Sequence, residues 1–210
     1  MRRKKWPALV ASLAILCSLA GLVVYKRHTK PPAIEKPDPR TWSQFNEQKR
    51  LQMLLQGFAI ESIVDLPCCD LNILGQLDLG VKRYIGVIEK KEQAHALQAQ
   101  FGSKIRTFLD RDITKDLLPK VDLILCWDYL CTLTSQEARA ALLQFKKSGA
   151  KFLLMRHYPE VKENSENTTG VLQPINWKYP PYQFPEPIIQ IMEKGDYGME
   201  NLALWNLNDL

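Results

Sequence analysis

Apolar and polar positions alternate in two different ways along residues 42–210, and this pattern predicts an α/β fold. Short apolar runs of strand length, bounded by polar or proline residues, lie at residues 62–66, 83–87, 105–108, 121–126 and 151–155. Segments whose apolar residues recur at helical spacing lie around residues 51–58, 94–101 and 138–145. Strands that alternate with helices in this way predict a parallel sheet that is covered by helices on both faces.

The boundaries of several predicted elements carry local signals. Thr134 and Glu137 form a capping box at the start of the helix around residues 138–145, and Gly149 is placed to end that helix. The stretches 188–191 and 202–205 are apolar without a helical pattern between them, which predicts an antiparallel hairpin at the sheet edge. Residues 159–187 are rich in Asn, Thr, Pro and aromatic residues, and a long loop on a rigid sheet is a typical place for function.

The N-terminal region contains an uncharged run from Trp6 to Tyr25. About 20 residues at a rise of about 1.5 Å each span the hydrocarbon core of a bilayer, so we expect one transmembrane helix there. A cleaved signal peptide, with Ser18 to Ala20 as the cleavage region, is the alternative, although the apolar run continues beyond it. The predicted organisation is a basic N-terminus (1–5), a transmembrane helix (6–25), a proline-rich linker (26–41) and one domain (42–210).

The net charge of +5 does not indicate a nucleic-acid-binding face, because seven Lys and Arg residues and no acid precede residue 31. These charges flank the apolar run on both sides, so they leave its orientation open. The five cysteines match no zinc-site spacing and suggest reduced, buried thiols, which favours a single-pass membrane protein with its domain in the cytoplasm. No metal site is expected. The sequon at Asn167 is expected to be a chance match.

Acidic residues follow most of the predicted strands. In an open parallel sheet, ligands bind beyond the carboxyl ends of the strands. The segments that follow the strands there are residues 65–70, 88–89, 110–113, 127–128 and 156–158. A glycine-rich phosphate loop with a lysine is missing, whereas acids suit a ligand with hydroxyls, an amine and positive charge. Each acid alone could be a cap of a strand or helix end. His157 is a candidate general base, although a single histidine at a strand end is more often structural.

Residues 65–72, Asp-Leu-Pro-Cys-Cys-Asp-Leu-Asn, resemble the first motif of a class I S-adenosylmethionine-dependent methyltransferase family, Asp-Leu-Pro/Gly-Cys-Gly-Asp-x-Asn. The resemblance continues over roughly residues 45–210, in residues 84–86, 112–116, 118–120, 122–126, 146–149, 174–176, 184–187 and 204–207. It implies a Rossmann-like sheet with helices on both faces and a C-terminal antiparallel hairpin.

The resemblance also implies a site for S-adenosyl-L-methionine. The loop from Pro67 to Asp70 would pass the methionine part, and an acid at the end of the second strand would bind the ribose. Asp112 would accept a hydrogen bond from the adenine amino group, the Ile113 backbone would contact the ring, and Asp128 would lie near the sulfonium and the substrate. The implied cofactor contacts are Asp65, Pro67, Cys68, Cys69, Asp70, Glu89, Asp112, Ile113 and Asp128. Asp128 and His157 are the candidate catalytic residues.

The chain departs from the family pattern at the predicted crevice. Cys69 replaces a glycine, Ile88 stands where the family has its ribose-binding acid, with Glu89 one position later, and Trp127 and Thr132 replace an arginine and a histidine. Residues 155–157 replace a run of threonines. Two hypotheses therefore stay open. The chain is a membrane-anchored methyltransferase with an unknown small-molecule or protein acceptor, or it is a catalytically inactive, membrane-tethered binding module that has lost the cofactor.

Overall fold

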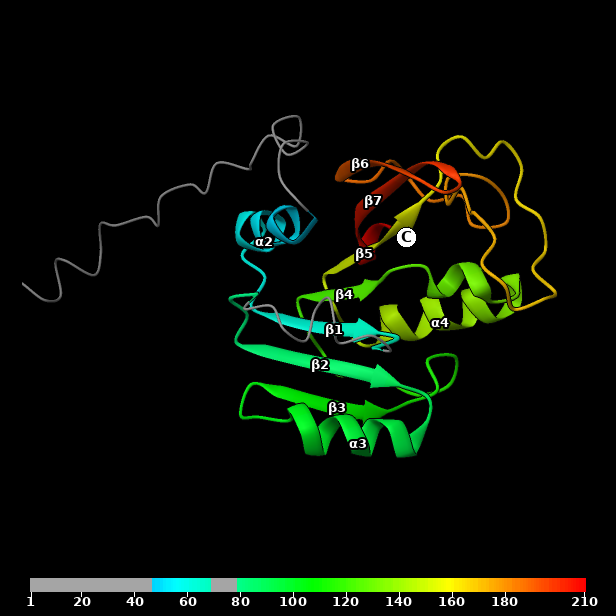
Figure 1. The fold of residues 1–210 in the computed structure, drawn as a ribbon. Helices are drawn as coiled ribbons and strands as arrows, with labels where there is room; N and C mark the ends of the chain where they lie inside the picture. The colour runs from blue at the N-terminus through cyan, green and yellow to red at the C-terminus, as the bar shows by residue number, and fades with distance from the viewer. Residues whose placement is uncertain (1–46, 69–78) are drawn as a thin grey trace, which may run out of the picture. The chain divides into compact units, whose positions relative to one another are not determined.

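A seven-stranded mixed sheet lies at the centre of the computed structural model, which describes residues 47–68 and 79–210 (Figure 1). The strand order is β3-β2-β1-β4-β5-β7-β6. The strands are β1 (Ser62–Leu66), β2 (Arg83–Ile88), β3 (Arg106–Asp110), β4 (Leu123–Cys126), β5 (Phe152–His157), β6 (Ile189–Gly195) and β7 (Gly198–Asn206). β1 to β5 pair in parallel, and β7 pairs antiparallel with both β5 and β6. The predicted α/β fold and the C-terminal hairpin are therefore confirmed.

β4 begins at Leu123, two residues later than the apolar pattern predicts, and Asp122 directly before it ties neighbouring strands together at their amino ends. Its Oδ2 accepts hydrogen bonds from Ser62 Oγ at 2.8 Å and Ser62 N at 3.1 Å, and its Oδ1 accepts one from Lys151 Nζ at 2.8 Å. Burial alone would raise the pKa of Asp122, but the hydrogen bonds from Lys151 and Ser62 lower it to about 2. One carboxylate thus links the first residue of β1 to the residues directly before β4 and β5.

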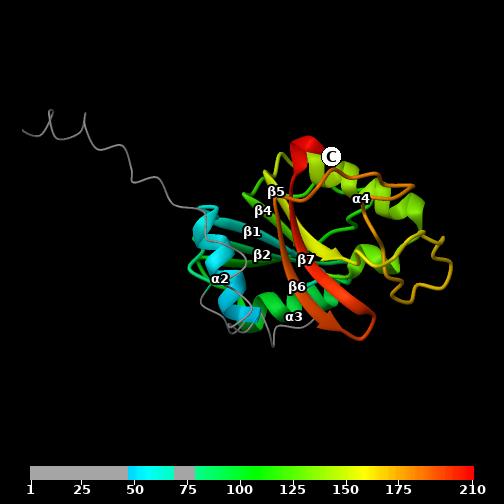
Figure 2. The ribbon, with the colours of Figure 1, turned by 90° about the horizontal axis from the view of Figure 1, so that it is seen from above.

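Two hydrophobic clusters cover the two faces of the sheet, and Figure 2 shows helices on both sides of it. The helices are α2 (Glu47–Gly57), α3 (Lys91–Phe101) and α4 (Ser135–Lys147), and the short 3-10 helices are η2 (Tyr129–Thr132) and η3 (Leu207–Asp209). α2 and α3 contribute to the cluster on one face, and α4 contributes to the other. The predicted capping box of Thr134 and Glu137 is present, and Gly149, at a φ of +72°, follows the end of α4.

A long loop, residues 158–188, completes the α4 face of the sheet. Trp177 is fully buried there, and its ring lies 4.5 Å from that of Tyr182 and 5.7 Å from that of Phe184. The Asn164 side chain donates to the carbonyl groups of Asn176 and Pro180 and accepts from the Asn176 amide, which fixes the path of the loop. The loop therefore acts as a cover of the core, which amphipathic periodicity did not indicate.

The sequon residue Asn167 is part of this loop. Its side chain is 3% exposed, and its Nδ2 donates to the carbonyl oxygens of Cys131 at 2.9 Å and Val171 at 2.8 Å. The nitrogen that glycosylation would modify is therefore held inside the folded domain.

The predicted transmembrane helix at residues 6–25, the linker and the domain boundary near residue 42 lie outside the described residues. Within residues 47–68 and 79–210, no helix combines the length and the apolar character that crossing a membrane requires.

Candidate functional site

The parallel pairing of β1 to β5 brings the residues that follow these strands to one edge of the sheet, as the sequence predicted. Two of the predicted cofactor contacts, Cys69 and Asp70, lie outside the described residues. Pro67 follows β1 directly and is partly exposed. The other predicted residues form four separate groups along this carboxyl edge, and each group has its own partners.

Asp65, Tyr84 and Cys68 form a buried hydrogen-bonded group on the α2 and α3 side of the sheet. The Tyr84 hydroxyl donates to Asp65 Oδ2 at 2.5 Å and lies 3.2 Å from Cys68 Sγ. Asp65 is 3% exposed and Cys68 2%, so both side chains point into the core. Burial raises the pKa of Asp65 to about 7, although the hydrogen bonds from Tyr84 and Cys68 oppose the rise. The side chains of these two predicted contacts are therefore buried in the core, where they interact with Tyr84.

Sequence reasoning gave no role to Tyr84, which it treated only as part of a strand. A tyrosine in a short buried strand needs a hydrogen-bond partner for its hydroxyl group. A buried acid in the neighbouring strand is such a partner, and this reasoning could have predicted the pair of Tyr84 and Asp65.

The absence of a side chain at Gly86 leaves room for Cys68 and Phe108 to pack against the backbone of β2. A Cβ at this position would lie 2.6 Å from Phe108 Cδ1 and 2.9 Å from Cys68 Sγ. Gly86→Ala is therefore expected to lower the free energy of unfolding by about 1–3 kcal/mol through overpacking. Urea denaturation measures this loss. Phe108→Leu removes the nearest ring atoms, so Gly86→Ala should cost less in the Phe108→Leu background, and equal costs in both backgrounds would contradict the packing explanation.

Glu89 and Tyr129 meet across the carboxyl edge. Glu89 follows β2 and is exposed, and the Tyr129 hydroxyl, from η2 after β4, donates to Glu89 Oε1. β1 lies between β2 and β4, so this hydrogen bond spans the end of β1. Ile88, one position earlier, is buried in the cluster on the α2 and α3 face. Glu89 is thus the exposed acid that directly follows β2.

Asp112 caps the turn after β3. Its Oδ1 accepts from Thr114 N at 2.9 Å and Thr114 Oγ1 at 2.6 Å, and its Oδ2 accepts from Lys115 Nζ at 2.5 Å. The hydrogen bonds from Lys115 and Thr114 lower its pKa to about 2, so it is ionised at neutral pH. The next residue, Ile113, is 1% exposed and packs in the α4-side cluster.

Asp128 lies after β4 and is one-third exposed. Its Oδ1 accepts from the Tyr158 hydroxyl at 2.8 Å, and its Oδ2 lies 3.8 Å from Arg156 Nε. The Arg156 guanidinium lies over the Trp127 ring, 5.6 Å from its centroid. Burial raises the pKa of Asp128, while the hydrogen bond from Tyr158 and the charge of Arg156 oppose the rise. This acid is therefore held between a phenol and a cation.

His157 lies in the core. It is 1% exposed, its ring is 5.8 Å from that of Trp205, and it pairs in register with Asn201 of β7. Burial and the nearby charge of Lys178 lower its pKa to about 4, so it is neutral at physiological pH. Within the described part of the chain, its Nδ1 has no hydrogen-bond partner. This environment favours the structural alternative over a general base.

Within the described ranges, no three or more His, Cys, Asp or Glu side chains come together in a way that could hold a metal ion.

Comparison with known proteins relates the fold to solved structures. No protein-family model and no curated protein sequence matches the chain. The N-methyltransferase NodS from Bradyrhizobium japonicum WM9 aligns with a TM-score of 0.53 at 14% identity over 76% of this chain and 91% of NodS. The methyltransferase domain of bacterial CtHen1 aligns with a TM-score of 0.54 at 15% identity over 76% of this chain and 98% of that domain.

Magnesium protoporphyrin IX methyltransferase (ChlM) from Synechocystis PCC 6803, solved with bound SAH, aligns with a TM-score of 0.50 at 13% identity over 91% of this chain and 97% of ChlM. The described chain therefore has the Rossmann-like α/β fold of methyltransferases, with a mixed seven-stranded sheet and an antiparallel C-terminal hairpin.

Proposed function

We propose that the chain is an S-adenosylmethionine-dependent methyltransferase that acts on an acceptor still to be identified. The observation that carries this proposal is the series of acids at the carboxyl ends of β2, β3 and β4 in a methyltransferase fold. Glu89 is exposed, and the side chains of Asp112 and Asp128 are about one-third exposed. Ligands of open α/β sheets bind at this edge.

The chemistry of these groups fits the cofactor. S-adenosylmethionine would supply a methyl group on a positively charged sulfur. Carboxylates accept hydrogen bonds from amino and hydroxyl groups and favour a nearby positive charge. Asp112 would accept from the adenine amino group, and Glu89 would accept from the ribose in place of the Tyr129 hydroxyl. Asp128 would lie beside the sulfonium and the acceptor.

The chain's own residues would bind and orient the reactants rather than react with them. Tyr158 holds Asp128 through a hydrogen bond of 2.8 Å, so the carboxylate is directed before any ligand arrives. Burial raises the pKa of Asp128. The carboxylate is therefore a better base for the proton that an amine or hydroxyl group of the substrate loses when it takes up the methyl group. Orientation and exclusion of water are the main requirements of such a transfer.

A catalytically inactive binding module is the second candidate, and a specific observation favours it. The acids of this edge have partners within the chain: Asp65 has Tyr84, Glu89 has Tyr129, Asp112 has Thr114 and Lys115, and Asp128 has Tyr158. A ligand would have to replace several of these hydrogen bonds, which lowers the net gain on binding.

Titration calorimetry of the full chain with S-adenosylmethionine distinguishes the two candidates. The methyltransferase proposal expects saturable heat with a dissociation constant in the micromolar range, and competition by S-adenosylhomocysteine. Absence of heat at millimolar cofactor would exclude the enzyme and leave the binding module.

Asp112→Ala is expected to weaken cofactor binding about ten- to hundredfold, because it removes a charged acceptor from the adenine amino group. Lys115→Ala is the matched control. Both changes abolish the ion pair between Asp112 and Lys115, but only the first removes the acceptor. Calorimetry should therefore show near-normal or tighter binding for Lys115→Ala. Equal losses of affinity in both variants would mean that cofactor binding depends on the structure of the turn after β3 and not on the Asp112 carboxylate as a hydrogen-bond acceptor.

We also propose that residues 6–25 anchor the protein as a single-pass membrane protein with residues 42–210 in the cytoplasm. Supporting this, residues 6–25 are uncharged and flanked by basic residues. The full chain should stay in the membrane fraction after alkaline extraction, and protease added to sealed, right-side-out vesicles should leave the domain intact. Release at alkaline pH would contradict the anchor.

A further inference from the structure

The hydrogen bond between Tyr129 and Glu89 forms a bridge across the carboxyl edge of the sheet. The Tyr129 hydroxyl donates to Glu89 Oε1. Glu89 follows β2, and Tyr129 is the first residue of η2, which follows β4. β1 lies between these two strands, so the bridge covers two strand spacings, about 10 Å. It therefore crosses the end of β1.

This bridge lies where an open α/β sheet binds its ligand. The strand order β3-β2-β1-β4-β5 extends from β1 in two directions, so the order of the chain reverses between β1 and β4. Ligands of such sheets bind outside the carboxyl ends of the strands at this reversal. The bridge connects the strand on one side of β1 to the strand on the other. It therefore crosses the position that we assign to the cofactor.

The backbone of Tyr129 is fixed by its surroundings. Its carbonyl oxygen accepts a hydrogen bond from Thr132 Oγ1 at 2.8 Å within η2. The Cys131 carbonyl oxygen accepts hydrogen bonds from Gln173 N and Asn167 Nδ2, both at 2.9 Å, which fasten η2 to the loop 158–188. Opening the bridge therefore requires a rotation of the Tyr129 or Glu89 side chain rather than a movement of the backbone.

The nearest cation to the bridge is committed to another acid. Lys115 Nζ lies 2.5 Å from Asp112 Oδ2. The hydrogen bond with Asp112 is the main cause of the raised pKa of Lys115, and the charges of Asp116 and Glu89 add to it. Within the described ranges, the residue that donates a hydrogen bond to the Glu89 carboxylate is Tyr129. The state of this acid therefore depends on the bridge.

The Tyr129 hydroxyl resembles the ribose hydroxyl that we assign to Glu89. Both groups are neutral O–H donors to a carboxylate. A ribose that binds Glu89 would exchange one such hydrogen bond for another, so the net gain from this contact falls by the free energy of the bridge. Hydrogen bonds to a charged acceptor are among the stronger ones, so the expected cost is a five- to tenfold loss of affinity, roughly.

We propose that the bridge between Tyr129 and Glu89 is an autoinhibitory latch, which closes the cofactor site until the Tyr129 hydroxyl leaves Glu89. This inference rests on the methyltransferase proposal and adds a control of cofactor access to it. The latch gives the internal hydrogen bond of Glu89 a role in an intact site, whereas an inactive binding module would have no cofactor to exclude.

Titration calorimetry of the full chain with S-adenosylmethionine tests the latch in Tyr129→Phe, which keeps the ring and removes the hydroxyl. This variant should bind the cofactor about five- to tenfold more tightly than the unchanged protein, because no hydrogen bond has to be exchanged. In the Glu89→Gln background the same change should have a smaller effect, since a neutral amide accepts a weaker hydrogen bond from Tyr129.

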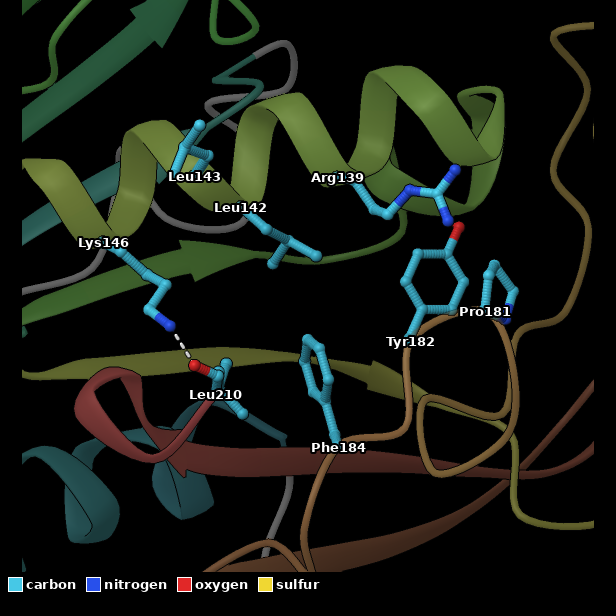
Figure 3. Close-up of a pocket in the computed structure, with 8 residues that line it drawn as sticks. All are labelled: Arg139, Leu142, Leu143, Lys146, Pro181, Tyr182, Phe184 and Leu210. Atoms are coloured by element: carbon cyan, nitrogen blue, oxygen red, sulfur yellow. Dashed lines mark hydrogen bonds between the residues drawn. The ribbon is translucent and has the colours of Figure 1, made fainter.

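Tyr182→Phe is the matched control. Tyr182 is a partly buried tyrosine that packs against the same hydrophobic cluster as Tyr129, and its side chain also forms a hydrogen bond, with Ser135. It lines a hollow of about 210 Å³ beside α4, where Figure 3 shows it next to Arg139 and Pro181. The described lining of this hollow includes none of the acids of the carboxyl edge. Tyr182→Phe should therefore bind the cofactor as the unchanged protein does.

The outcomes separate the latch from the methyltransferase proposal. Equal affinities of the unchanged protein and Tyr129→Phe would overturn the latch and leave the methyltransferase proposal standing. Weaker binding by Tyr129→Phe would also overturn the latch, because Tyr129 would then contribute a contact to the ligand. A gain for Tyr182→Phe as large as that for Tyr129→Phe would show that the bridge is not the cause. Absence of heat in every protein at millimolar cofactor would overturn both proposals.

Discussion

Trp177→Ala is expected to lower the free energy of unfolding by about 3–5 kcal/mol, the largest effect on stability that we expect from a single change in the loop 158–188. Trp177 is fully buried, stacks on Phe184, and donates from Nε1 to the carbonyl oxygen of Arg156 at 2.6 Å. Alanine would leave a large cavity in the cover of the sheet and would remove this hydrogen bond to β5. Equilibrium denaturation in guanidinium chloride measures the loss.

Tyr179→Ala is the matched control for this prediction. Tyr179 lies two residues further along the same loop and is 38% exposed, so its removal should change the free energy of unfolding by less than about 1 kcal/mol. Trp177→Phe should recover part of the loss. A cost for Trp177→Ala no greater than that for Tyr179→Ala would mean that the loop is not part of the core.

The second large effect is a pH dependence that Asp65 causes. Its pKa is 3.8 in the unfolded chain and about 7 in the folded one, so the folded protein holds the proton more tightly. The stabilisation is fully present below pH 4 and is lost as the pH rises to about 7. Three pH units correspond to about 4 kcal/mol. Relative to Asp65→Asn, the free energy of unfolding should therefore fall by about this amount between pH 4 and pH 7.

Urea denaturation at several pH values measures both proteins. Parallel curves for the unchanged protein and Asp65→Asn would contradict the prediction. His157 must be separated from this effect, because its pKa is lowered to about 4 in the folded state. Its contribution has the opposite sign, since it is present above pH 6.5 and is lost as the pH falls to 4. The unchanged protein should thus show a flatter profile than Asp65→Asn, in which the contribution of His157 is no longer offset by that of Asp65.

The sequence predicts the fold well because the strands are apolar and the helix ends carry explicit signals. The predicted strand 62–66 coincides with β1, and the capping box of Thr134 and Glu137 starts α4 as expected. The predicted fourth strand is two residues too long at its start. An acid inside an apolar run gives no sign by itself that it binds Ser62 and Lys151 across neighbouring strands.

The candidate site is harder to predict, because its partners come from distant segments. Tyr84 and Tyr129 are 19 and 40 residues from Asp65 and Glu89, and only the folded sheet brings each pair together. The buried position of His157, by contrast, can be predicted from the sequence. Side chains alternate along a strand, so His157 shares a face with the buried Met155. The alternation along this strand therefore already indicates that His157 lies in the core.

Asp122 has a consequence for how this protein can diverge. One carboxylate joins the amino ends of β1, β4 and β5, on the far rim from the acids that a ligand would meet. This link does not involve the acids at the carboxyl ends of the strands. Substitutions of the exposed acids at the opposite rim leave this link intact, so we expect the architecture to persist when the chemistry of that rim changes.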